Sequence, residues 1–167
     1  MAGDNASRLT TQEKQYHSIF FGDSLNTWTS YHLVPVERPS ISAPEPKFLF
    51  VSVPGADGDL DFTEALDDRI HYNQRTGSWT FYVLHEAIEN YDWASLWMRL
   101  LEDLHGKFFH ISLADEETIG PWYYFGRVWL DEWQSDPSHS KVVIKYNLDP
   151  FRYPSVEAYD AREGGSL

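Results

Sequence analysis

The pattern of hydrophobic positions predicts one amphipathic helix at about residues 92–105, because apolar side chains recur there on a single helical face. Asp92 is the predicted N-cap, and Gly106 is the predicted residue just after the last turn. A stripe of this kind has to be buried, so we expect Leu100→Asp to unfold the domain. The stripe consists of Trp93, Leu96, Trp97, Leu100, Leu101 and Leu104.

Extended segments are predicted along most of the remaining chain. Residues 16–36 read as two extended pieces around Gly22 and Asp23, and residues 79–84 alternate with a period of two. Gly126 lies inside a predicted strand, which indicates a bulge or a close approach of another backbone. Further strands are predicted at residues 47–53, 107–113, 122–134 and 139–151.

This order of elements indicates a mainly β (α+β) domain. We expect a single domain at residues 16–153, a flexible N-terminal segment at residues 1–15 and a C-terminal tail at residues 154–167. Between the first extended pieces and the strand at 47–53, four prolines forbid helix and central strand and leave an extended arm. Such an arm lies on a surface, either of its own domain or of a neighbour. The prolines are Pro35, Pro39, Pro44 and Pro46.

Charge and composition narrow the possible partners. The chain has 13 Lys and Arg against 26 Asp and Glu, a net charge of −13, which disfavours sequence-specific nucleic-acid binding and binding to anionic lipid. There is no cysteine, so thiolate metal sites and cysteine nucleophiles are ruled out. No apolar run approaches the roughly 20 residues of a membrane span, and the polar N-terminus lacks the apolar core of a signal peptide.

The acidic stretch VPGADGDLDFTEAL at residues 53–66 could indicate a metal or phosphate site. A calcium loop of the EF-hand type starting at Asp57 would need Gly at its sixth place and Glu at its twelfth, where this chain has Phe62 and Asp68. A phosphate-binding loop would need a lysine, and this stretch has none. A looser calcium site stays open as an alternative, and the main interpretation is an exposed turn.

Other motifs give weak support for catalysis. HEAIE at residues 85–89 lacks the second histidine of a zincin, and Asp131 and Glu132, as neighbours in a strand, point to opposite faces. We therefore predict no catalytic residue, no metal ligand and no cofactor, and keep a hydrolase with dispersed acids as a rival. Trp122 and Tyr123 form a candidate aromatic patch that could stack on sugars, with strand packing as the alternative.

Six phrases occur in one order and spacing between residues 17 and 152, and as a set they resemble the distal tail proteins of long-tailed bacteriophages and prophages of Gram-positive bacteria. The phrases are NTWTSYHLVPVERPSISAPEPK, VPGADGDLDFTEAL, NQRTGSWTFYVL, LLEDLHGK, YYFGRVWLDEWQSD and SKVVIKYNLDPF.

The resemblance implies a tail-tube-like β-sandwich or barrel with one flanking helix and an extended arm used in ring contacts. It also implies a homo-oligomeric ring, commonly a hexamer, which joins the tail tube protein to the tail tip or baseplate hub protein and lets DNA pass; the tape-measure protein is a further possible partner. The expected location is the virion tail, assembled in the host cytoplasm. Longer members carry a C-terminal galectin-like domain, which we expect this chain to lack.

Within this resemblance, two segments become candidate ring interfaces. The candidate interface loop comprises Pro54, Gly55, Asp57, Asp59 and Asp61, whose acidic groups are expected to face a ring neighbour or the lumen. The candidate interface arm comprises Pro35, Arg38, Pro39, Pro44 and Pro46. Two alternatives stay open at this point: a carbohydrate-binding module that uses the aromatic patch, and a related tail-tube or tail-completion protein.

Overall fold

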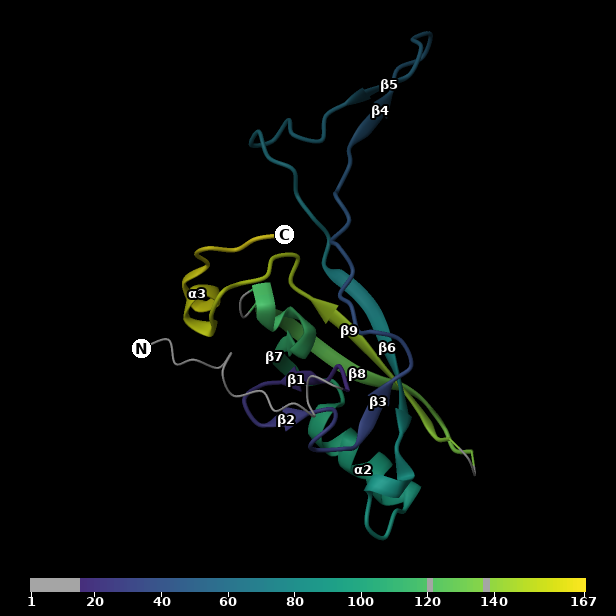
Figure 1. The fold of residues 1–167 in the computed structure, drawn as a ribbon. Coiled ribbons are helices and arrows are strands. Elements are labelled where there is room, and N and C mark those ends of the chain that lie inside the picture. The colour runs from purple at the N-terminus through teal and green to yellow at the C-terminus, as the bar shows by residue number, and fades with distance from the viewer. Residues whose placement is uncertain (1–15, 120–121, 137–138) are drawn as a thin grey trace.

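The computed structural model describes residues 16–119, 122–136 and 139–167, and its main feature is one antiparallel sheet (Figure 1). The sheet has seven strands in the order β2-β1-β7-β8-β9-β6-β3. Every neighbouring pair in it is antiparallel, and the mainly β class expected from the sequence is confirmed. The strands are β1 (Ile19–Phe21), β2 (Leu25–Asn26), β3 (Leu33–Pro35), β6 (Arg75–Val83), β7 (Phe108–Leu113), β8 (Tyr124–Gln134) and β9 (Lys141–Leu148).

The predicted amphipathic helix is α2 (Trp93–Leu104), which packs on the sheet and contributes Leu96, Leu100 and Leu104 to the core. Its first turn is capped as expected, since the Asp92 carboxylate accepts a hydrogen bond from the backbone N–H of Ser95 at 3.2 Å. Gly106 follows the helix with a φ of +74°, a conformation that glycine adopts without strain. The stripe is therefore buried through its central leucines.

The outer residues of the helix differ from the simple periodic pattern. Trp93 begins the helix and is 48% exposed, with its ring centroid 6.5 Å from that of Trp133. Asp103, which lies outside the apolar stripe, also contacts the body of the protein, because its carboxylate accepts a hydrogen bond from the Tyr31 hydroxyl at 2.7 Å. Burial, and then this carboxylate, raise the pKa of the Tyr31 phenol.

Long strands β8 and β9 form the centre of the sheet, and the alternation of their residues places one face of each in the core. Gly126 confirms the expected close approach, because a Cβ atom there would lie 2.2 Å from the Asn147 carbonyl oxygen and 2.6 Å from the Leu148 Cα. The β-bulge in this pair lies farther along, between Leu130 and Glu132. Glycine at position 126 therefore allows β8 and β9 to pair over their full length.

The proline-rich segment after β3 lies on the chain's own sheet. The Ser40 carbonyl accepts a hydrogen bond from Trp79 Nε1 at 2.9 Å, and the Ser42 backbone N–H donates to the Tyr146 hydroxyl at 3.0 Å. Arg75 Nη1 donates to the Ser42 carbonyl at 2.9 Å. These bonds hold the segment over two stacked core aromatics, Trp79 and Tyr146, whose centroids are 4.4 Å apart. The segment is thus extended, as predicted, and it covers its own domain.

The end of the chain folds back on the sheet. Residues 154–167, expected to be a tail, contain α3 (Val156–Ala161), whose N-cap Ser155 accepts a hydrogen bond from the Ala158 N–H at 3.0 Å. Tyr159 of this helix stacks on Phe125 of β8, with centroids 3.8 Å apart and planes 2° apart. The described residues also contain two short 3-10 helices, η2 (His85–Ala87) and η3 (Ala114–Ile119).

Candidate functional site

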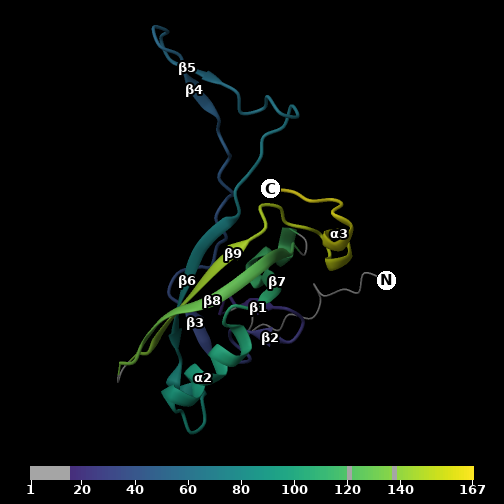
Figure 2. The same cartoon turned by 180° about the vertical axis from the view of Figure 1, so that it is seen from behind.

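A β-hairpin at residues 46–72, which we call the projecting hairpin, extends far from the sheet in both Figure 1 and Figure 2. It contains β4 (Phe50–Ser52) and β5 (Asp59–Asp61), which pair antiparallel as a separate two-stranded sheet. At its base, Pro46 and Tyr72 form an antiparallel bridge, and the Lys47 N–H donates to the His71 carbonyl at 2.8 Å. The acidic stretch of the sequence therefore forms the outer half of an arm.

The projecting hairpin is almost entirely exposed and is rich in large apolar side chains. From Glu45 to His71, Thr63 is the one residue that is not exposed. Of the fourteen exposed large hydrophobic side chains among the described residues, nine belong to this hairpin, with exposed fractions from 38% to 89%. They are Phe48, Leu49, Phe50, Val51, Val53, Leu60, Phe62, Leu66 and Ile70.

The apolar residues lie on both faces of the ribbon. Phe48, Leu49, Phe50 and Val51 are consecutive, and consecutive residues of a strand point to opposite faces. An isolated two-stranded ribbon is at best marginally stable in water. Contact with another surface would therefore stabilise this hairpin more than solvent does.

The tip of the hairpin carries the predicted interface loop. Pro54 opens the turn, and Gly55 and Gly58 adopt positive φ angles of 84° and 77°, which explains the glycines at these places. The Asp61 carboxylate accepts a hydrogen bond from the Thr63 N–H at 2.9 Å, and hydrogen bonds from the Thr63 hydroxyl and N–H lower the pKa of Asp61. Asp57 and the other loop residues are exposed.

The loop has no geometry of a cation site. Within residues 16–119, 122–136 and 139–167, no group of three or more His, Cys, Asp or Glu side chains is placed to hold a metal ion. His85 of the HEAIE stretch instead stacks on Tyr91, with centroids 4.2 Å apart.

The predicted arm residues do not come together with this loop. Pro39 and Pro44 are buried, and Pro35 is half-buried at the end of β3. The exposed Arg38 side chain forms an ion pair with Asp115 at 3.1 Å. Of the five residues predicted for the interface arm, Pro46 at the base of the projecting hairpin is the one that belongs to the arm seen in the structure.

The predicted aromatic patch is occupied by the chain itself. The Arg152 guanidinium carbon lies 4.5 Å from the ring centroid of Trp122, and Tyr123 pairs with Tyr153 through two backbone hydrogen bonds of 2.9 and 3.0 Å. Both Trp122 and Tyr123 are half-buried. Arg152 and Tyr153 thus cover part of both residues, and sugar stacking on the patch stays a prediction.

One carboxyl group has a perturbed environment. Burial raises the pKa of Glu116, against the opposing effects of the Tyr124 hydroxyl, which donates to it at 3.1 Å, and of Arg152 and Arg75. The neighbouring Asp115 already binds His17 at 2.7 Å, and it also binds Arg38. Glu116 thus lies in a group of buried and half-buried interacting side chains that includes Arg75 of β6, Tyr124 of β8 and Arg152.

Sequence reasoning placed a strand and an exposed turn at residues 47–66, and it missed that this segment leaves the body of the protein. The available signal was the run of four consecutive apolar residues at positions 48–51, which lacks the alternation of a half-buried strand. Such a run indicates a strand covered on both faces, and the body of this chain covers neither.

Comparisons with known proteins place the fold. No protein-family model matches the sequence, and a search of curated proteins also finds no match. Among solved structures, the fold is similar to that of the SPP1 Dit (gp 19.1) protein, described as a paradigm of the hub adsorption apparatus in phages that infect Gram-positive bacteria, with a TM-score of 0.59 and 19% sequence identity.

The match covers 83% of this chain and 52% of that chain, so the present sequence spans about half of the SPP1 protein. The Dit-like fold expected from the resemblance to distal tail proteins is confirmed. None of the helices in the described part of the chain is long and apolar enough to cross a membrane.

Proposed function

We propose that this chain is a structural, non-enzymatic subunit of a phage tail tip or baseplate hub, which assembles into a ring through its projecting hairpin. The observation that carries the proposal is the exposed apolar hairpin on a fold similar to that of a phage hub protein. The ring, for which we propose six copies, joins the tail tube protein to the tip or hub protein and leaves a passage for DNA.

The size of the exposed apolar surface supports an assembly contact. Large apolar side chains present about 150–250 Å² each, so the exposed fractions of the nine hairpin residues correspond to roughly 800 Å². This is about the area that each partner contributes to a standard protein–protein interface. Solvent exposure of such a patch in a lone monomer would favour non-specific aggregation.

The position of the hairpin favours a ring over a two-fold dimer. The hairpin extends from one end of the sheet, away from α2 and from the core (Figures 1 and 2). A hairpin that lies on a different surface of the next copy makes a head-to-tail contact, and repeated head-to-tail contacts close into a ring when the rotation permits.

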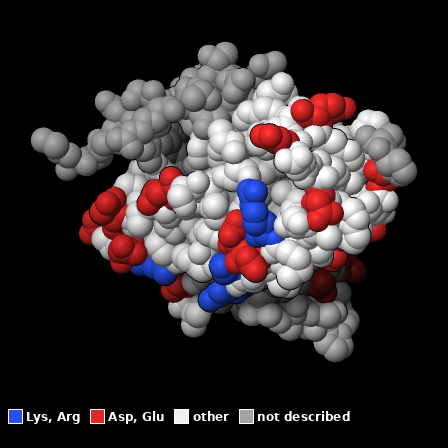
Figure 3. Space-filling view, turned by 90° about the horizontal axis from the view of Figure 1, so that it is seen from below, with Lys and Arg blue, Asp and Glu red and all other residues white. Residues whose placement is uncertain are grey.

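The charge of the chain supports a passage that does not bind DNA tightly. The net charge is −13, and acidic side chains spread over the face seen from below, with Lys and Arg in a small group among them (Figure 3). An acidic lumen repels passing DNA and keeps it from adhering. The proposed partners are therefore proteins: further copies of the chain, the tail tube protein, the tip or hub protein and the tape-measure protein. The proposed location is the virion tail, with assembly in the host cytoplasm.

Light scattering and negative-stain imaging of the purified chain test the proposal. We expect a mass near six times the 19.4 kDa of one chain and closed rings in the images. A monomer at micromolar concentration would contradict the ring. Stacking of rings into long tubes would instead favour the alternative of a tail-tube protein.

Charge reversal at the tip of the hairpin gives a more local test. The double substitution Asp57→Lys with Asp59→Lys is expected to disturb ring assembly and to leave the monomer folded, because both residues are exposed. Glu86→Lys with Glu89→Lys makes the same charge change at two exposed positions near η2 and serves as the matched control. If both variants assemble equally well, the candidate interface loop is not part of the ring interface.

A further inference from the structure

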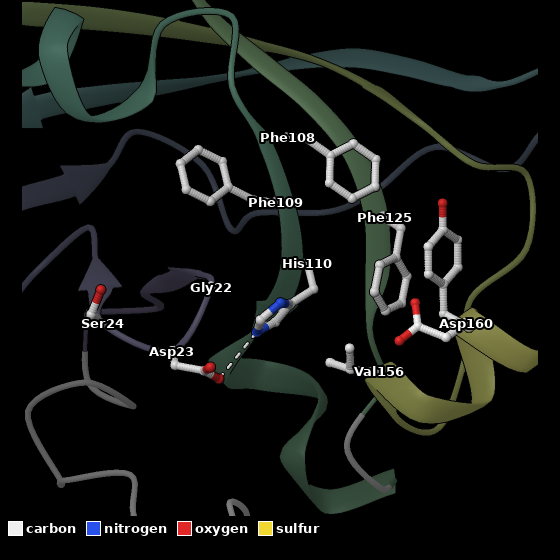
Figure 4. Close-up of a pocket in the computed structure, with 10 residues that line it drawn as sticks. Gly22, Asp23, Ser24, Phe108, Phe109, His110, Phe125, Val156 and Asp160 are labelled. Carbon is white, nitrogen blue, oxygen red and sulfur yellow. Dashed lines mark hydrogen bonds and ion pairs between the residues drawn. The ribbon is translucent and has the colours of Figure 1, made fainter.

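A groove with aromatic walls lies on the sheet beside α3, and we call it the aromatic groove. It consists of two hollows of about 420 and 460 Å³ that share Phe108, Phe125 and Tyr159 as lining residues. Figure 4 shows the first hollow, with Phe108 and Phe109 of β7 on one side and α3 on the other. The turn at residues 22–24 closes one end, and Trp129 of β8 lines the other hollow.

The groove has a firm apolar floor. Phe125 is buried under Tyr159, which lies parallel to it with ring centroids 3.8 Å apart. Phe108 stands beside them at 6.3 Å from Tyr159 and is 49% exposed. Hollows with aromatic walls and a polar rim are typical acceptors for an inserted side chain of a partner.

Several charged groups at the rim have partners within the chain. His110 Nε2 lies 3.2 Å from an Asp23 carboxylate oxygen, as the dashed line in Figure 4 shows. Arg162 forms an ion pair with Asp149 at 3.5 Å, and Arg127 donates a hydrogen bond to the Gly106 carbonyl at 2.9 Å. Asp160, which also lines the first hollow, is exposed. An apolar segment can therefore enter between the aromatic rings while this carboxylate stays in water.

We propose that the aromatic groove receives the projecting hairpin of a neighbouring copy; this inference rests on the proposed ring. A donor surface of roughly 800 Å² needs an apolar acceptor on the same chain if the ring is made of one protein. Outside the hairpin, five large apolar side chains of the described residues are exposed: Val36, Trp93, Met98, Phe108 and Leu167. Phe108 is the one that lines both hollows of the groove.

A pair of matched substitutions tests the acceptor. Phe108→Glu places a charge in the groove, and it is expected to raise the dissociation constant of the assembly by more than about tenfold. Met98→Glu makes a comparable change at a residue that is 55% exposed on α2, and it is expected to leave assembly unchanged. The inference would be overturned if Met98→Glu loses assembly while Phe108→Glu assembles like the unsubstituted chain.

Cross-linking between two different chains locates the contact directly. The chain has no cysteine, so one variant carries Leu60→Cys or Leu66→Cys in the hairpin and a second variant carries Ser24→Cys at the groove. All three positions are exposed or half-buried. After mixing, a short bismaleimide is expected to give a covalent heterodimer. Met98→Cys in place of Ser24→Cys is expected to give none.

The outcomes separate the two proposals. Rings that form but cross-link through Met98→Cys, or through neither position, overturn the groove and leave the proposed function intact. Absence of any assembly of the unsubstituted chain contradicts both. Cross-linking between the hairpin and Ser24→Cys within the assembly supports both.

Discussion

Excision of the projecting hairpin should separate folding of the domain from assembly. Residues 47–71 can be replaced by Asn-Gly, because Pro46 and Tyr72 already form an antiparallel bridge and this dipeptide favours a two-residue hairpin turn. We expect the shortened chain to fold and to remain monomeric.

The expected change in stability is small and can be estimated from the structure. From Glu45 to His71, only Thr63 is not exposed, so excision removes little packing against the body. A shorter connection also lowers the entropy cost of loop closure by about 0.6 kcal/mol for each halving. We therefore expect a thermal midpoint that is unchanged or a few degrees higher, at roughly 2–4 °C per kcal/mol for a domain of this size.

Circular dichroism and light scattering measure the two quantities independently. A thermal midpoint well below that of the full chain would show that the hairpin is part of the folded core, against its exposure in the structure. An assembly of unchanged stoichiometry would refute the reasoning that the exposed apolar hairpin holds the copies together.

Three further substitutions test the body of the fold. Leu100→Ala is expected to lower the free energy of unfolding by about 3 kcal/mol, because Leu100 is fully buried. Met98→Ala, on the exposed side of α2, should change the free energy of unfolding little. Equal effects of the two substitutions in urea unfolding would contradict the placement of α2. Gly126→Ala should cost about 1–3 kcal/mol or more, since its Cβ would meet the Asn147 carbonyl, and wild-type stability would argue against the close approach. Burial raises the pKa of Glu116 above 4.5, so the folded state favours the protonated form of Glu116 more than the unfolded state does. The native chain should therefore lose stability relative to Glu116→Gln as pH rises through and above that value. A difference in stability between the two chains that does not change with pH would refute this.

Local sequence rules were sufficient for the elements that bury one face. The central leucines of α2 and the strands β7, β8 and β9 follow the expected periods, because each of these elements packs on the body of the same chain. The N-cap at Asp92 and the backbone approach at Gly126 follow from single residues whose physical roles are narrow. The proline-rich segment was expected to be extended, but its hydrogen bonds to Trp79 and Tyr146 depend on residues far away in the sequence.

The remaining features depend on contacts that no local pattern contains. Helix α3 has six residues between Ser155 and Arg162, too short for a periodic signal, and it is held by Tyr159 on Phe125. The aromatic groove joins β7, β8 and α3, which are separated by many residues in the chain. The direction of the projecting hairpin was also hidden, because periodicity shows which faces are apolar and not which surface covers them.

The acidic tip of the hairpin has a physical role that agrees with assembly through its apolar strands. A two-stranded ribbon exposes two strand edges, and exposed apolar edges pair readily with other chains. Asp59 and Asp61 are the two ends of β5, and Asp57 lies in the turn before it. Like charges at these positions oppose edge-to-edge pairing of two hairpins. Reversal of all three carboxylates to lysine keeps like charges at the tip while it changes the sign that a neighbouring surface meets. The reversed variant should therefore stay soluble as it loses the ring, and precipitation would show that the sign of the charge is not what matters for assembly.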